Sequence, residues 1–290
     1  MTNATVAERP AGSLARILRA TGEVLRWAFL LFWAVLTLVP LYWMIIGAFK
    51  DRMAVTRMPP DWIPHPFVLD GWVNLFKAGQ PLLWMFNSGL VSITVTLTNL
   101  LFATMAGYAF SKLRFPGRDQ IFWIFMASMM IPGELTLIPL YLLVTSVLNM
   151  GNSYSGLIVP HLVSVGSIFL MKQFIQSLPS SLMDAARIDG CGEFRLFWKV
   201  VMPLARPGLA VLAIFTFVGQ WSSFFWPLLI ANDTAHRVIQ VGLATFKYEN
   251  TTDYGAMMAG AVLASIPIAI LFVSMQKHFL KGITIGGLKG

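Results

Sequence analysis

Long stretches without a charged residue constrain this chain more than any other feature. Arg26 and Lys50 bracket 23 uncharged residues, and between 120 and 171 the only charged residue is Glu134. A soluble domain has about 25% charged residues; here 12% are charged and 57% are hydrophobic. One soluble core could not bury so much apolar surface, so the sequence predicts an integral membrane protein that crosses the bilayer several times.

The number of crossings follows from the lengths of these stretches. A helix needs about 20 apolar residues to cross hydrocarbon about 30 Å thick, and lipid cannot satisfy open backbone groups. The stretch 120–171 is too long for one crossing, and 149–153 has the composition of a turn. The sequence therefore predicts an all-α fold of six spans, at about 27–49, 85–110, 120–145, 155–174, 207–231 and 255–275.

Basic residues predict the orientation of these spans. The termini and the second and fourth connections together hold 15 Lys and Arg, and the other connections hold 6. Because excess positive charge stays in the cytoplasm, both termini are expected there. The loops 50–84, 146–154 and 232–254 would then face outward. The predicted organisation is a cytoplasmic arm, 1–26, followed by one transmembrane domain, 27–290. The net charge of +8 then reports topology and not nucleic-acid binding.

Four tryptophans fall near the predicted ends of spans: Trp27, Trp43, Trp84 and Trp226. Such positions predict an aromatic belt that anchors the helices at the membrane surface. The apolar segment after Arg26 is too long for a signal peptide, and no small-residue cleavage site follows it. We therefore expect no cleavable leader.

The second span has two different flanks at helical spacing. The apolar flank, expected to face lipid, consists of Leu90, Ile93, Leu97, Leu100 and Leu101. The small polar flank, expected to face protein or a cavity, consists of Ser88, Ser92, Thr96 and Asn99. These polar residues either pack against neighbouring helices or line a translocation pathway.

The chain has no catalytic or nucleotide-binding motif. It lacks the phosphate-binding loop G-x-x-x-x-G-K-[ST], as well as HExxH, CxxC and G-x-S-x-G, and its four His residues are dispersed. One Cys permits no internal disulfide. We expect no enzyme activity, no metal and no cofactor bound by this chain.

Three further polar residues at membrane depth are candidates for the pathway: Glu134, His161 and Gln220. A charge there suggests function. Yet Pro132 and Pro139 bracket a helix irregularity, whose freed backbone groups Glu134 could bond. His161 has the alternatives of packing and pore lining. A carrier driven by an ion gradient, with Glu134 central, remains an alternative function, although matching broken helices in two halves are not evident.

The loop between the fourth and fifth spans, 175–206, has local order of its own. Ser181 and Asp184 resemble a capping box, which predicts a short helix ended by Gly190 and Gly192. Its small-residue face would consist of Leu182, Ala185, Ala186 and Ile188. A second helix is predicted to begin near Glu193 and to stop or kink at Pro203. Its apolar stripe would consist of Phe194, Phe197, Trp198 and Val201. Such a pair suits either a docking element for a cytosolic partner or a helix lying on lipid headgroups.

The residues of this loop resemble a known family motif. The run 184–190, Asp-Ala-Ala-Arg-Ile-Asp-Gly, followed by Phe194, Phe197, Trp198, Pro203 and Pro207, resembles the EAA motif of binding-protein-dependent ABC importer permeases. Asp184 stands where Glu is usual, and Cys191 where Ala is usual. The segments 108–118, 130–141 and 282–290 resemble parts of carbohydrate-type permeases. The likeness runs from about residue 27 to the end and is strongest to the six-span maltose-type second permease.

The resemblance implies a type I ABC importer permease fold with cytoplasmic coupling helices. A second similar permease would complete the pathway, two cytosolic ATPase subunits would hydrolyse ATP, and an extracytoplasmic binding protein would deliver solute. The residues implied in ATPase coupling are Asp184, Ala185, Ala186, Arg187, Asp189, Gly190, Phe194 and Phe197. The outward residues Trp62, Pro64, Trp72 and Phe76 would either meet the binding protein or fold the loop on itself. The C-terminal tail would reach the ATPase interface. Sugars, polyols, glycerol phosphodiesters and sugar phosphates all remain possible solutes.

Overall fold

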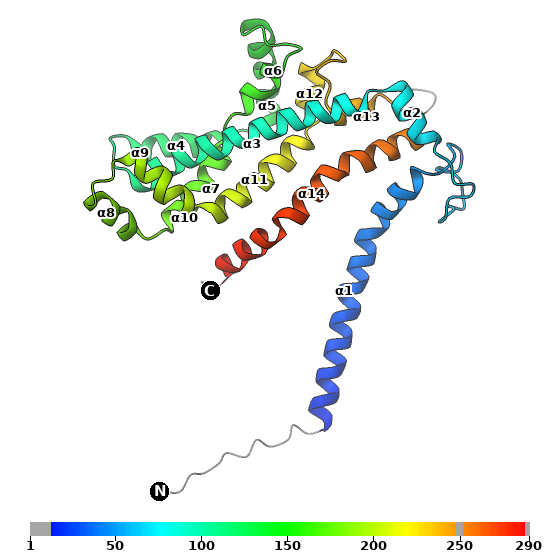
Figure 1. The fold of residues 1–290 in the computed structure, drawn as a ribbon, viewed down its shortest axis with the longest axis horizontal. Helices are drawn as coiled ribbons and strands as arrows, with labels where there is room; N and C mark the ends of the chain where they lie inside the picture. The colour runs from blue at the N-terminus through cyan, green and yellow to red at the C-terminus, as the bar shows by residue number, and fades with distance from the viewer. Residues whose placement is uncertain (1–12, 248–251, 288–290) are drawn as a thin grey trace.

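The computed structural model describes residues 13–247 and 252–287, with side chains for 20–247 and 252–276. Helices make up most of this part of the chain (Figure 1). Three of them are long and apolar enough to cross a membrane unbroken. They are α1 (Ser13–Gly47), α3 (Pro81–Lys112) and α14 (Tyr254–Gly287).

Three further candidate spans are pairs of helices joined at a bend, so the described residues hold three unbroken spans, or up to six if each bent pair is counted as one. The first pair, Arg118–Ser128 (α4) with Gly133–Val147 (α5, Gly133–Leu142, and a π-helical turn), bends by 96°. The second, Tyr154–His161 (α6, Tyr154–Ile158, and a 3₁₀ turn) with Val165–Gln176 (α7), bends by 43°. The third, Glu193–Leu204 with Arg206–Trp221 (α11), bends by 77°, and only α11 falls within the predicted fifth span, 207–231.

The breaks follow from local chemistry. Pro132 cannot continue α4 because its ring would clash with the carbonyl of Ser128, where α4 ends. The irregularity predicted around Pro132 is therefore present. At the second break the Ser164 hydroxyl caps α7 by accepting from the Ser167 N–H at 3.1 Å.

The sequence predicts the fifth span as one continuous helix over 207–231, but the structure divides it into two helices. Its main helix, α11, ends at Trp221, and a short helix, α12 (Phe225–Ile230), follows after a break. Pro227 explains the break, because in a continuous helix its ring would meet the carbonyl of Ser223. At the other end of the chain, α1 begins at Ser13, inside the predicted arm 1–26, and residues 1–12 lie outside the described part.

The central helix is α3, which packs against α7 and α11 (Figure 1). Its lipid flank is exposed at Leu90, Ile93 and Leu97, at 37%, 52% and 61%. Its polar flank is buried: Ser88, Ser92, Thr96 and Asn99 are all less than 9% exposed. The polar flank is therefore buried as expected, whereas the predicted apolar flank is exposed only in part, since Leu100 and Leu101 are half-buried and Leu100 packs against the core.

The predicted aromatic belt is wrong at two of its four positions. Trp84 and Trp226 are buried inside the protein. The Trp84 ring lies against Gly242 and Phe246, and the Trp226 Nε1 donates to the Gly156 carbonyl at 3.0 Å. Their positions in the sequence predicted that both rings lie at the membrane surface. In the structure both rings are buried, because neighbouring helices pack against them. Trp27 is exposed and Trp43 is half-buried.

Candidate coupling element and cavity

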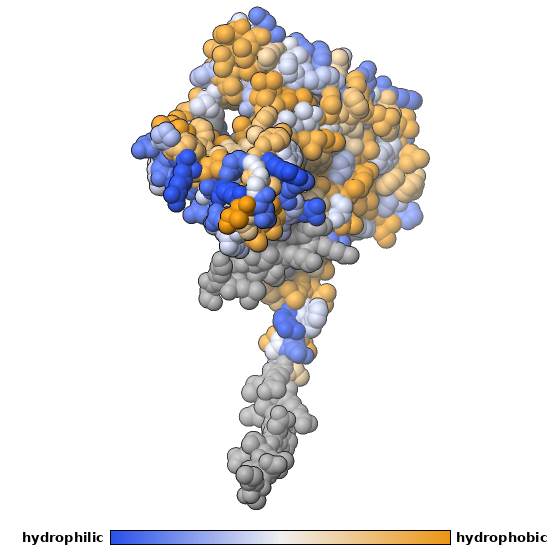
Figure 2. Space-filling view, turned by 60° about the vertical axis from the view of Figure 1, so that its left-hand side comes forward, coloured by the Kyte–Doolittle hydropathy of each residue, from blue (hydrophilic) through white to orange (hydrophobic). Residues whose placement is uncertain are grey.

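The segment that follows α7 forms a two-helix projection at one end of the molecule (Figure 1). We call it the coupling element: α8 (Ser180–Ile188), a turn at 189–192, and α9 (Glu193–Leu196) with a π-helical turn over Phe197–Val201. Figure 2 turns this end forward and shows hydrophilic residues gathered there beside hydrophobic ones. Its exposed residues include Asp184, Ala185, Ile188, Asp189, Gly190 and Phe194.

The turn depends on a glycine. Gly190 has φ +79°, in the left-handed region that side chains disfavour. The Cys191 N–H donates to the Ala186 carbonyl at 3.0 Å, and the Gly190 N–H donates to the Arg187 carbonyl at 3.0 Å. This closes α8 with a Schellman-type end and sends the chain into α9. The glycine predicted to end the first helix does so.

The start of α8 corrects the predicted capping box. The helix begins at Ser180 with Pro179 at the cap position, and no side chain makes a cap hydrogen bond there. Ser181 therefore lies inside the helix, which begins two residues earlier than the predicted capping box implies. Lys112, at the end of α3, instead stabilises the start of α8. Its Nζ donates to the Leu178 carbonyl at 2.7 Å and to the Ser180 hydroxyl at 3.2 Å.

Arg187 ties the two helices of the coupling element together. Its Nε donates to Glu193 Oε1 at 2.8 Å, and its Nη1 donates to Asp184 Oδ1 at 2.9 Å. The Tyr108 hydroxyl, on α3, donates to the other oxygen of Glu193. The hydrogen bond that Arg187 donates to Glu193, together with the negative charge of Glu193, raises the pKa of Arg187, so the guanidinium stays charged. Three polar side chains thus connect α8 and α9 to the central helix.

The predicted apolar stripe of the second helix is divided between two faces. Phe197 and Val201 are buried, and Phe197 packs on the Tyr108 ring at 5.8 Å between centroids. Phe194 and Trp198 are exposed, at 73% and 44%. The π-helical turn explains the difference, because it widens the helix and shifts side chains away from α-helical spacing.

Sequence reasoning missed Lys112, Tyr108 and Glu193 as parts of this arrangement. Tyr108 and Lys112 lie in the segment 108–118 that resembles carbohydrate-type permeases, but the resemblance assigned them no role. Lys112 and its partner Leu178 are 66 residues apart in the chain, and Tyr108 and its partner Glu193 are 85 residues apart. A contact at such separation has no local signal.

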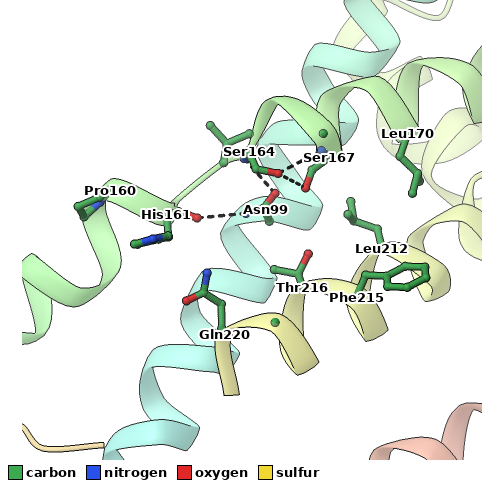
Figure 3. A pocket seen from close by; sticks show the side chains of 13 residues that line it. Asn99, Pro160, His161, Ser164, Ser167, Leu170, Leu212, Phe215, Thr216 and Gln220 are labelled. Carbon is green, nitrogen blue, oxygen red and sulfur yellow. Dashed lines mark hydrogen bonds between the residues drawn. The ribbon is translucent and has the colours of Figure 1, made fainter. Parts of the chain in front are cut away.

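A separate cavity of about 350 Å³ lies between α3, α7 and α11 (Figure 3). Its lining includes Asn99, His161 and Gln220 from the seven predicted pathway candidates. Ser88, Ser92, Thr96 and Glu134 do not line it. The Ser88 hydroxyl accepts from the Ile239 N–H at 2.8 Å, and the Thr96 hydroxyl donates to the Ser92 carbonyl at 2.6 Å. Glu134 is exposed in the first turn of α5, where the positive end of the helix dipole favours a carboxylate.

Asn99 supports the broken backbone beside this cavity. Its Nδ2 donates to the His161 carbonyl at 3.1 Å, and its Oδ1 accepts from the Ser164 N–H at 3.3 Å. Irregular backbone at membrane depth is tolerated where protein or a cavity satisfies it. The His161 ring lies against Trp226, with 5.7 Å between centroids.

The predicted outward anchors lie partly against their own loop. Trp62 packs on Trp43 at 5.6 Å, and Trp72 packs near Phe49 at 6.0 Å between centroids. Trp62 and Phe76 keep about half of their surface exposed, and Pro64 is half-buried. Residues 248–251 of the other outward loop lie outside the described part. The C-terminal tail, 282–290, is helical to Gly287, and its side chains and last three residues also lie outside it.

The described residues therefore define an all-helical membrane protein with a projecting helical pair and a cavity between three spans. Groups of three or more potential metal ligands are absent from this described part. This architecture is that of a membrane permease. The family of binding-protein-dependent transport system inner membrane components matches residues 99–285, and the chain belongs to this family.

Relatives along nearly the whole chain support this membership. The arabinooligosaccharides transport system permease protein AraQ of Halalkalibacterium halodurans is 35% identical over 94% of this chain and 99% of its own. The sn-glycerol-3-phosphate transport system permease protein UgpE of Yersinia enterocolitica is 32% identical over 86% of this chain and 91% of its own. A bacterial ABC transporter involved in import of the acidic polysaccharide alginate has a similar chain fold, with TM-score 0.79 and 22% identity over 93% of this chain and 99% of that one.

The chain is thus a multi-pass inner-membrane permease subunit of a binding-protein-dependent ABC importer and not an enzyme. Membership implies that ATP is hydrolysed by partner subunits. An ion-coupled carrier centred on Glu134 does not fit this family, and Glu134 is exposed outside the cavity.

Proposed function

We propose that this subunit forms half of the pathway for a carbohydrate, an oligosaccharide or a related solute, and that the coupling element docks on a cytosolic ATPase subunit. The observation that carries the docking role is the surface of α8 and α9. It presents exposed apolar side chains, Ile188 at 87% and Phe194 at 73%, beside the carboxylates of Asp184 and Asp189. An exposed apolar centre with a charged rim is typical of a protein interface.

The same element is built to transmit motion. Met183 and Leu196 are buried beneath the exposed surface, at 1% and 0%, so both helices rest on the permease core. The Arg187–Glu193–Tyr108 connection adds a polar tie to α3. A force applied to α8 would therefore move α3 and not only a loop. Of the implied coupling residues, Phe197 is buried and supports the element from inside.

The placement of the coupling element in the cytoplasm follows from the excess of basic residues on its side of the membrane. Both termini would share that side. The loops 50–84 and 232–254 would face the extracytoplasmic binding protein, with Trp62 and Phe76 as its exposed aromatic contacts. A second permease subunit would cover the apolar surface of α1, whose membrane segment is only 6% buried in this chain. The lipid bilayer surrounds the rest.

The substitution Ile188→Asp tests the docking role without disturbing the core. Its side chain is almost fully exposed, so the permease should insert normally, while the ATPase subunits should no longer co-purify with it. Met58→Asp is the matched control, because Met58 is 86% exposed but lies in the outward loop. Normal ATPase co-purification and uptake with Ile188→Asp would refute the coupling role.

A further inference from the structure

The cavity between α3, α7 and α11 contains polar groups that the protein leaves unused. Among the residues that the structure describes, neither the Thr216 hydroxyl nor the Gln220 amide has a hydrogen-bond partner. Both project from α11 into the space below Asn99 (Figure 3). A polar group at membrane depth costs free energy unless it is hydrogen-bonded, so these two call for water or a ligand.

The opposite wall supplies a second polar edge. The Ser164 and Ser167 hydroxyls lie 2.7 Å apart and share one hydrogen bond, and Asn99 is already committed to the broken backbone. Nδ1 of His161 is buried without a hydrogen bond of good geometry, although the Leu157 carbonyl lies near enough to interact with the ring. Hydroxyl groups both donate and accept, so they can bond to hydroxyls and to an amide alike.

The remaining wall of the cavity is apolar. Leu170, Leu212 and Phe215 line the right-hand side of the space in Figure 3. Among the described residues that line the cavity, none is Asp, Glu, Lys or Arg. A phosphate or carboxylate would enter without a counter-charge in this subunit, and an unpaired charge in such a place is very costly. A sugar ring fits better, since it carries neutral hydroxyls at its edge and C–H groups on its faces.

We propose that this cavity is a contact site for one uncharged sugar unit of the transported solute, with Gln220 and Thr216 as the residues that hydrogen-bond its hydroxyls. The proposal deepens the proposed function and rests on it. The volume, about 350 Å³, is at the small end of ligand pockets, which are commonly about 300–1,000 Å³. It therefore holds one part of an oligosaccharide, and the rest lies against the partner permease.

The test uses the complete importer, with its own partner permease, ATPase subunits and binding protein, in proteoliposomes. Four probes are compared: neutral arabinotriose and maltotriose, and anionic trigalacturonate and sn-glycerol 3-phosphate. The wild type should take up at least one neutral probe and prefer it to the anionic ones. Uptake of anionic probes alone, or of no probe in the panel, would overturn the proposal.

The double variant Thr216→Val with Gln220→Leu keeps the shape of the side chains and removes their hydrogen-bonding groups. Losing two ligand hydrogen bonds should lower uptake of the neutral probe roughly thirtyfold at sub-saturating concentration. The matched control is Gln173→Leu on α7, which is exposed outside the cavity and should transport like the wild type. Should the double variant fail to assemble, Thr216→Val alone, with nearly unchanged volume, should still lower uptake severalfold.

Co-purification separates the two levels of the proposal. If the ATPase subunits co-purify with a variant that transports the neutral probe at the wild-type rate, the cavity inference fails and the permease role stands. If they do not co-purify with the wild-type chain, the proposed function itself fails.

Discussion

Arg187→Met should loosen the coupling element without unfolding the permease. Methionine keeps the apolar stem of arginine and removes the guanidinium, which bonds Asp184 at 2.9 Å and Glu193 at 2.8 and 3.4 Å. Glu193 would keep its bond from Tyr108. The link that is lost therefore joins α8 to α9, while the link from α9 to α3 remains.

The magnitude follows from how exposed the partners are. The Asp184 side chain is 62% exposed, so its pair with Arg187 contributes only about 0.3–0.5 kcal/mol. The Glu193 side chain is 48% exposed, and two hydrogen bonds to one carboxylate raise its contribution to about 1 kcal/mol after solvent screening. Together they stabilise the closed element by about 1.4 kcal/mol, which corresponds to roughly a tenfold change in local opening.

Hydrogen–deuterium exchange measured by mass spectrometry reports this opening directly. In the complete importer, peptides covering 184–196 should exchange roughly tenfold faster in Arg187→Met, and peptides of α7 should be unchanged. Arg195→Met is the control, because among the described residues Arg195 has no ion-pair or hydrogen-bond partner. Equal exchange in the wild type and Arg187→Met, or an equal acceleration in Arg195→Met, would refute the reasoning.

Two further predictions concern folding. Gly242→Ala should destabilise the chain by about 1–3 kcal/mol, since the new methyl would lie 2.3 Å from the Trp84 ring; thermal unfolding should show this loss, whereas Gly89→Ala, with no atom within 4 Å, should be neutral. Burial raises the pKa of Asp233, but bonds from His236 outweigh it and lower the pKa below its ordinary 3.8. Its contribution is therefore complete above that value and lost as pH falls through the folded pKa, so Asp233→Asn should lower Tm near pH 6, and its difference from the wild type should shrink as pH falls below 3.8.

The sequence predicted an all-helical membrane fold and the position of the helix break at Pro132, because both depend on local composition. It also placed the glycine turn of the coupling element correctly at Gly190. It failed where a side chain's surroundings decide the outcome. Trp84 and Trp226 lie near predicted membrane surfaces yet are buried, and Ser181 lies within α8.

The residues around the cavity show the same difference between what the sequence predicts and what helix packing decides. Hydropathy alone could nominate Asn99, His161 and Gln220 as polar residues at membrane depth, but it nominated Ser88 and Ser92 equally. Helix packing distinguishes the two groups. The Ser88 hydroxyl accepts a hydrogen bond from the Ile239 N–H, whereas Gln220 lines the cavity. Thr216 and Ser164 lacked a signal, because a single threonine or serine in an apolar span usually bonds its own backbone.

Local features of the sequence thus determined the fold class and the family of this chain. Charge-free length specifies helices in lipid, and a fixed run of residues between two spans specifies the family, since both are properties of neighbours in the chain. Tertiary structure alone decided which polar side chains are satisfied and which remain available. A hydrogen bond between residues as distant as Tyr108 and Glu193 exists only after the helices have packed, and no periodicity in the sequence encodes it.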